Sequence, residues 1–145
     1  MFKHILVPTD GSPLSESAVM KGIELAHALG ARVTGLHVTP HFHVLTYRPD
    51  MLEETREEFD RDSRAAADRH LAFVRKTADE MGVPCATLRT VSEEVDQSII
   101  DTAREHACDL IVMASHGRRG LGRVLMGSQT QRVTTHSNVP VLVCR

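Results

Sequence analysis

The chain has 145 residues, of which 41% are hydrophobic and 25% are charged, and its formal net charge is -2. These proportions exclude an intrinsically disordered chain, and the near-neutral charge gives no bulk attraction to nucleic acid or to an anionic membrane. Aromatic residues make up only 3%, which excludes a row of aromatic platforms for stacking nucleic-acid bases. The length fits one domain spanning residues 1–145.

The first part of the chain predicts a strand, a helix and a second strand. Residues 2–8 form a short apolar run, and the loop at 9–13 ends in Ser-Pro, a good helix start because serine caps and proline suits the first turn. The helix continues to Leu29, Gly30 closes it, and residues 31–38 predict the second strand. The residues expected to be buried share a three- or four-residue spacing: Ala18, Gly22, Ala26 and Leu29.

A long helix is predicted in the middle of the chain. Residues 39–50 predict an irregular connection, and residues 51–81 predict an amphipathic helix that Gly82 ends. Charged residues occupy its solvated face, and residues 83–91 predict the third strand. The expected apolar stripe of the helix consists of Leu52, Phe59, Ala66, Phe73 or Val74, Ala78 and Met81.

The last part of the chain continues the alternation of helices and strands. Ser92 is expected to cap a third helix, and residues 109–115 predict the fourth strand. A fourth helix begins near Gly127 and Ser128, and residues 139–144 predict the fifth strand. The apolar residues of the third helix recur every four positions: Val95, Ile99, Ala103 and Ala107.

This strict alternation predicts the α/β class. The expected architecture is a Rossmann-like open five-stranded parallel sheet with helices on both faces and strand order 3-2-1-4-5. The runs I-V-M-A and V-L-V-C are continuously apolar, as strands buried on both faces should be.

The cysteines and the N-terminus indicate the compartment. Cys85, Cys108 and Cys144 are far apart in the sequence, so the chain has no C-x-x-C redox pair and no zinc knuckle. Scattered cysteines in an odd number fit a reducing cytoplasm. The first residues lack the apolar run of a signal peptide, and the longest apolar stretches, about five residues, are too short to span a membrane. We therefore expect a cytoplasmic protein with no nucleic-acid and no membrane partner.

Two loops at the carboxyl ends of strands have the chemistry of a ligand site, since ligands of open α/β sheets bind at that edge. One loop, residues 8–12, reads P-T-D-G-S. The other, residues 115–126, carries several glycines and arginines before Gly127 and Ser128 open a helix. Glycine backbones and a helix N-terminus suit phosphate, and the hydroxyls of Ser128 and Thr130 can donate to it. The alternative is a plain surface loop. Its glycines and arginines are Gly117, Gly120, Gly122, Arg118, Arg119 and Arg123.

With these motifs the sequence resembles the universal stress protein family over essentially its whole length. The resemblance rests on I-L-V-P-T-D-G-S, G-L-H-V, I-V-M-A-S-H-G-R and the closing V-P-V-L-V. The nucleotide-binding branch of that family has the pattern G-x2-G-x9-G-[ST]. Here Gly117, Gly127 and Ser128 match the pattern, and Ala114 stands at the position of the first glycine.

The resemblance implies a binding site for ATP, with Mg²⁺ as a candidate companion ion. Thr9 and Asp10 resemble the positions facing adenine and ribose, with Pro8 beside them, and Val38 resembles the position packing against adenine. Asp10 as a turn residue and Val38 as plain core are the structural alternatives. The positions that resemble the phosphate cradle are Gly117, Gly127, Ser128, Thr130 and, mainly through its backbone, Gln129; Ala114, in place of the first glycine, is a further candidate for the site.

Neither a catalytic nor a metal site is predicted. His41 and His43 lie near each other with no carboxylate beside them, which is too few ligands for a metal. Ser115 and His116 are adjacent in the sequence, unlike the nucleophile and base of a triad. The chain also lacks the lysine of a Walker loop, the first-strand G-x-G-x-x-G fingerprint and the H-R-D of protein kinases.

The expected function is that of an ATP-binding stress-response module with a regulatory or sensing role, not an enzyme. Two alternatives stay open: a family member that acts through protein contacts without nucleotide, and a slow ATP hydrolase.

A homodimer through the fifth strand, Val139 to Cys144, is expected as well. Pro140 favours an edge position, while the apolar run Val141 to Val143 would be an aggregation hazard on an open edge. Pairing with a second copy meets both demands, and related family members pair in this way.

Overall fold

The computed structural model describes residues 1–42, 55–117 and 126–145. Strands and helices alternate as the sequence predicts. In chain order they are β1 (His4–Pro8), α1 (Pro13–Leu29), β2 (Arg32–Thr39), α2 (Arg56–Glu80), β3 (Cys85–Val91), α3 (Val95–Glu105), β4 (Leu110–Ala114), α4 (Ser128–His136) and β5 (Val141–Cys144).

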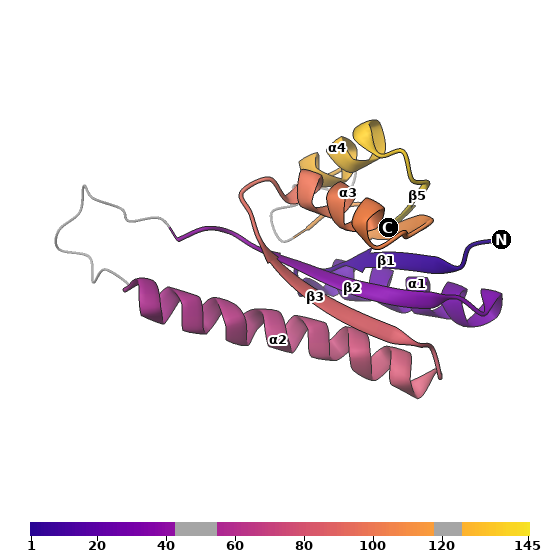
Figure 1. Cartoon of the computed structure of the whole chain (residues 1–145), viewed down its shortest axis with the longest axis horizontal. Helices are drawn as coiled ribbons and strands as arrows, with labels where there is room; N and C mark the ends of the chain where they lie inside the picture. The colour runs from indigo at the N-terminus through magenta and orange to yellow at the C-terminus, as the bar shows by residue number, and fades with distance from the viewer. Residues whose placement is uncertain (43–54, 118–125) are drawn as a thin grey trace.

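The strands form one parallel sheet in the order β3-β2-β1-β4-β5, which confirms the predicted order. Helices α1 and α2 cover one face and α3 and α4 the other (Figure 1). In β1, Ile5 and Val7 join the cluster beneath α1 and α2, whereas Leu6 joins the cluster beneath α3 and α4. The strand is therefore buried on both faces, as its unbroken apolar run indicates.

Helix α1 begins and ends at the predicted residues. The Ser12 hydroxyl accepts the backbone N–H of Ser15, and Gly30 takes the left-handed conformation after the last turn. The prediction of a buried Leu29 was wrong, because its side chain is 40% exposed. Ala31 is buried in the core instead. The turn at Gly30 brings Ala31 back to the helix, where the Ala31 N–H donates to the Ala26 carbonyl.

Helix α2 begins at Arg56 after a capping box, and its buried face matches the predicted stripe only in the second half, at Val74 and Ala78. The Thr55 hydroxyl accepts the N–H of Glu58, whose carboxylate accepts the N–H of Thr55. The predicted stripe advanced by seven residues at each step, and such a stripe drifts by about 20° per heptad around a straight helix. Ala66 is only half-buried for this reason, and position 52 lies outside the described residues. The buried residues are Ala67, Leu71, Val74 and Ala78.

Helix α3 also starts and ends differently from the prediction. Ser92 precedes the cap by two residues. Its hydroxyl accepts the N–H of Glu94, and Glu94 is the N-cap of the helix, which begins at Val95. Ala107 lies beyond the helix with a φ of 53° and is exposed, whereas Thr102 is buried. The four-residue spacing was right for Ile99 and Ala103, which are buried, and for Val95, which packs partly buried against the same cluster.

Within the described ranges, none of the helices has both the length and the apolar character that crossing a membrane requires.

Candidate functional site

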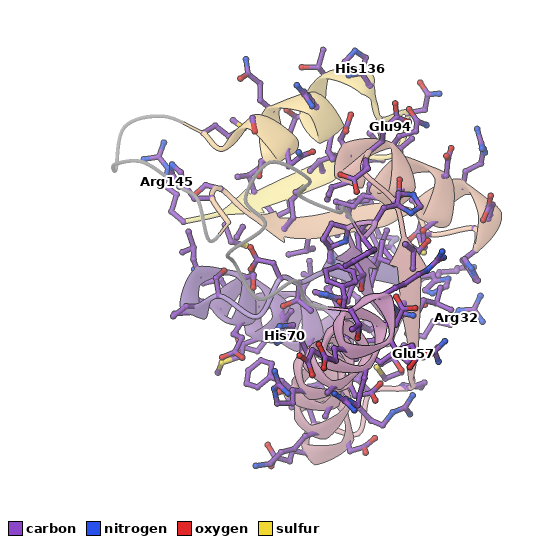
Figure 2. All side chains as sticks on the ribbon, turned by 90° about the vertical axis from the view of Figure 1, so that its left-hand side faces the viewer. Arg32, Glu57, His70, Glu94, His136 and Arg145 are labelled. Carbon is purple, nitrogen blue, oxygen red and sulfur yellow. The ribbon has the colours of Figure 1, made fainter. Side chains whose placement is uncertain are left out.

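The carboxyl ends of the strands form the edge that Figure 2 faces, with α4 above the sheet and α2 below it. The loops after β1 and β4 meet at this edge. A Cβ atom built on Gly117 would lie 2.6 Å from Oδ2 of Asp10, so the Asp10 carboxylate rests against the glycine backbone. The structure thus brings the first predicted ligand loop against Gly117, in the described start of the second.

The loop after β1 is fixed by its own polar groups. The N–H of Thr9 donates to the Leu36 carbonyl at 2.9 Å, and the Thr9 hydroxyl accepts the N–H of Gly11 at 3.1 Å. Oδ1 of Asp10 accepts the N–H of Ser12 at 2.9 Å. Asp10 is therefore a turn residue, one of the two roles considered for it, and its second oxygen still lies at the Gly117 loop.

Two histidines, His37 in β2 and His70 in α2, pack beside this loop. The sequence indicated neither of these roles. Nδ1 of His37 lies 2.9 Å from the Thr9 carbonyl, so Nδ1 carries the proton. His70 projects from α2, and its ring lies 5.1 Å from the His37 ring between centroids (Figure 2). A Cβ atom on Gly11 would overlap the His70 ring, which explains the glycine together with its φ of 78°. Only the docking of α2 on the sheet reveals this contact.

The first turn of α4 is tied to β4 and to the loop that follows it. The N–H of Gly127 donates to the Ser115 carbonyl at 2.6 Å, and the Thr130 hydroxyl donates to the Ala114 carbonyl at 2.8 Å. Thr130 is 3% exposed, so its hydroxyl is buried in this bond, where it positions the helix and does not reach a ligand. The expected donation to phosphate is left to the exposed Ser128 hydroxyl.

Position 127 favours glycine because the neighbouring backbone leaves little room for a side chain, and not because of its φ angle. Its φ is -58°, which any residue can adopt. A Cβ atom there would lie 3.1 Å from the Ser115 carbonyl oxygen and 3.3 Å from Cα of His116. A side chain at this position would push the start of α4 away from the loop.

The N-terminus of α4 has the properties of an anion site. Gly127 caps the helix without any side-chain hydrogen bond to its first turn. The first amide groups of a helix have no intrahelical partner and carry partial positive charge, so they attract phosphate oxygens. This turn stands beside the loop that carries Gly117, and the residues present therefore fit a nucleotide phosphate.

The remaining candidate residues lie along the same edge. Pro8 ends β1 and is half-buried. Val38, near the end of β2, packs partly against the cluster beneath α3 and α4, so it belongs to the core and to the edge at once. Ala114 ends β4 with 6% exposure. The oxygen of the Gln129 side chain accepts the N–H of Asp96 in α3 at 3.2 Å, a contact that the sequence did not indicate.

Neither a metal site nor an accessible nucleophile with its base is formed by the residues whose positions are described. They contain no group of three or more histidine, cysteine or acidic side chains suited to a metal. The Ser115 hydroxyl lies 2.9 Å from Nδ1 of His116 despite their adjacency, but Ser115 is only 5% exposed. The predictions for position 43, for the arginines at 118, 119 and 123 and for the glycines at 120 and 122 fall outside the described residues.

Most of the shifted titrations lie away from the ligand edge; the exception is Cys144, at the carboxyl end of β5. Burial raises the pKa of the Cys108 thiol to about 11, and burial also raises the pKa of Cys85 and Cys144. All three thiols are free, and a raised pKa lowers the fraction of reactive thiolate at neutral pH. At the amino ends of the strands, burial alone would raise the pKa of Asp109, but donated N–H groups of His4 and Lys3 hold it below its usual value.

Comparison with known proteins gives one family. Residues 1–145 match the family model described as the universal stress protein family. Universal stress protein MJ0531 of Methanocaldococcus jannaschii is 31% identical over 145 residues, which cover 100% of this chain and 83% of the relative. Universal stress protein YxiE of Bacillus subtilis is 30% identical over 153 residues and aligns along 100% of both chains.

Solved structures share the fold. Universal stress protein UspA from Lactobacillus plantarum superposes with a TM-score of 0.80 at 26% identity, covering 99% of this chain and 98% of its own. A universal stress protein in complex with cAMP gives 0.74 at 22% identity, with 99% and 97% covered. A family protein from Arabidopsis thaliana with AMP bound gives 0.68 at 17% identity, with 97% and 90% covered.

Proposed function

Because the chain belongs to the universal stress protein family, we propose that it binds ATP at the carboxyl edge of its sheet and acts as a regulatory or sensing module. The observation that carries the proposal is the meeting of three features at that edge. The Asp10 carboxylate touches Gly117, Gly127 touches the loop after β4, and the uncapped first turn of α4 stands beside both.

The ligand would extend along this edge from β2 to α4. Val38 and Pro8 offer apolar contact for adenine, and Asp10 offers a carboxylate oxygen to the ribose hydroxyls. The phosphates would meet the amide groups at the start of α4 together with the Ser128 hydroxyl. A carboxylate next to phosphate is unfavourable in itself, so Mg²⁺ bound to the phosphates would offset the charge of Asp10.

Relatives of known structure support an adenine nucleotide, since two proteins of this fold carry cAMP and AMP. We propose no catalytic role. Ser115 and His116 are the nearest approach to a nucleophile and a base, and the hydroxyl of that pair is buried. Phosphate release slower than ordinary enzyme rates of about 1 per second is therefore expected.

Nucleotide retained by the purified protein gives the most direct test. The protein would be denatured, the released small molecules would be separated by chromatography, and their molecular masses would be measured by mass spectrometry. ATP titrated into nucleotide-free protein should then give saturable heat, and Gly127→Val should weaken the binding strongly. A nucleotide-free protein that gives no heat with ATP, ADP or AMP would overturn the proposal and favour a function through protein contacts alone.

A further inference from the structure

The side chain of Gln129 links the first turn of α4 to a second helix. Its Oε1 atom accepts the N–H of Asp96 at 3.2 Å. Asp96 stands in the first turn of α3, and Glu94, which caps that helix, makes no side-chain hydrogen bond to it. Gln129 therefore supplies from α4 the acceptor that the N-terminus of α3 lacks locally.

This bond completes the fixing of the α4 turn. Thr130 holds the turn to the end of β4, and Gly127 holds it to the Ser115 carbonyl. Both of these bonds lie on the β4 side. The bond from Gln129 is directed to α3 and fixes the turn on its other side, so that the amide groups facing the ligand are held between two elements.

The segment before α3 is in turn bonded to the end of β2 and to the residues after it. The segment before α3 donates the N–H of Ser92 to the Thr39 carbonyl at 2.9 Å, and the Glu93 carboxylate accepts the N–H of His41 at 2.6 Å. Thr39 directly follows Val38, at the adenine end of the edge. The two ends of the ligand edge are thus joined through α3 as well as through the sheet.

We propose that Gln129 is a positioning residue for nucleotide phosphate: through its bond to Asp96 it holds the first turn of α4 in its binding position, and nucleotide binding in turn steadies the start of α3. The inference rests on the proposed function. It assigns to this side chain a role that its neighbour Ser128, which faces solvent, does not share.

Gln129→Met tests the role because methionine has a similar length and shape but no strong acceptor. Loss of one neutral hydrogen bond should weaken ATP binding about three- to tenfold. Adenosine lacks phosphates, so its affinity should stay within about twofold of the parent's. Gln131→Met is the matched control, since Gln131 is exposed on the same helix, and it should leave both affinities unchanged.

Hydrogen exchange at the Asp96 amide provides a readout that does not depend on the ligand affinity. That amide should exchange faster in Gln129→Met, and Gln129→Glu, which keeps an acceptor oxygen, should restore its protection. ATP should slow the same amide in the parent but not in Gln129→Met. Unchanged exchange in Gln129→Met would show that the bond is not formed in solution and would overturn the inference.

The affinities separate the remaining outcomes. Equal ATP affinity in the parent and in Gln129→Met would overturn the positioning role alone. An equal loss of ATP and adenosine affinity would also overturn it, because a general structural defect moves both. A parent protein that binds neither ligand would instead overturn the proposed function.

Discussion

Gly11 and Gly127 both stand at the ligand edge, and they exclude a side chain for different reasons. Gly11 has a φ of 78° and lies under the His70 ring, so both its conformation and its surroundings require glycine. Gly127 has an ordinary φ, and only the backbone of Ser115 and His116 stands in the way of a side chain. Substitution at Gly127 should consequently be graded by the size of the new side chain.

Gly127→Ala should weaken ATP binding only modestly, about two- to fivefold, because a contact of 3.1 Å requires a shift of a few tenths of an ångström. Gly127→Val adds branches against the same carbonyl and should weaken binding more than about fiftyfold. Calorimetric titration measures both. Gly30→Ala is the control: its φ of 66° makes the substitution destabilising, but it lies away from the ligand edge and should leave ATP affinity unchanged. Equal affinities in the parent and in Gly127→Val would contradict the proposed phosphate position.

Ala114→Gly should change ATP affinity by less than about tenfold. Ala114 ends β4, and among the residues whose backbone is described Ala107 alone of the non-glycines has a positive φ. The methyl group at position 114 therefore causes no backbone strain, which is the cost that a glycine would relieve. Titration of both proteins with ATP decides the matter. Binding by Ala114→Gly but not by the parent would show that this one methyl group places the chain among non-binding relatives.

At the scale of whole elements, the packing of α2 on the sheet depends on one small residue in β2. A Cβ atom on Gly35 would lie 2.8 Å from Cγ1 of Val74 and 3.2 Å from its Cβ. Val74 is fully buried in the middle of the α2 face. The helix can approach the strand this closely only because position 35 has no side chain.

Gly35→Ala should destabilise the protein by about 1–3 kcal/mol, the usual cost of overpacking a core. Val74→Ala should cost about the same through the space that it leaves. The double variant should lose less than the sum of the two, since the new methyl group enters the space that valine vacates. Urea unfolding of the four proteins completes the cycle. Strict additivity would mean that α2 moves away as a rigid body and does not repack.

The elements show what the sequence could and could not reveal. The caps of α1 and the strand order follow from local signals, the Ser-Pro start, the glycine end and the alternation of patterns. Helix α2 packs closely on the sheet at Gly35, a residue far away in the sequence. The contacts of His70 with Gly11 and of Gln129 with Asp96 likewise join separate elements. No spacing along the chain encodes them.

For the molecule as a whole, resistance to acid should depend on the amino edge of the sheet. Burial lowers the pKa of His4, helped by the charge of Arg32, and the ring bonds Thr34 at 2.7 Å. As the pH falls below about 6.5, His4 is protonated in the unfolded chain before it is protonated in the native protein. The free energy of unfolding therefore decreases as the pH falls. Between pH 7.5 and 5, the free energy of unfolding in urea should fall more for the parent than for His4→Gln. Equal losses would assign the acid sensitivity to other groups.

Association of two copies should occur along β5. The strand lies at the edge of the sheet, as predicted, and Leu142 in it is 45% exposed. An unpaired apolar edge strand invites pairing, and a two-fold axis lets the same strand of a second copy close it. Light scattering at micromolar concentration should give the mass of a dimer for the parent and of a monomer for Leu142→Lys. Ser137→Lys, placed before the strand, should remain dimeric. A monomeric parent would refute the dimer.

One hydrogen bond gives this association a thermodynamic consequence. The N–H of Ser115 donates to the carbonyl of Cys144, the last residue of β5, at 2.7 Å, and the Ser115 carbonyl accepts the first amide of the α4 cap. A single residue thus contacts both the strand that would pair and the turn that would hold phosphate. Linkage requires that any factor by which pairing changes nucleotide affinity is also the factor by which nucleotide changes pairing. A change in nucleotide concentration would then change the fraction of the protein that is dimeric.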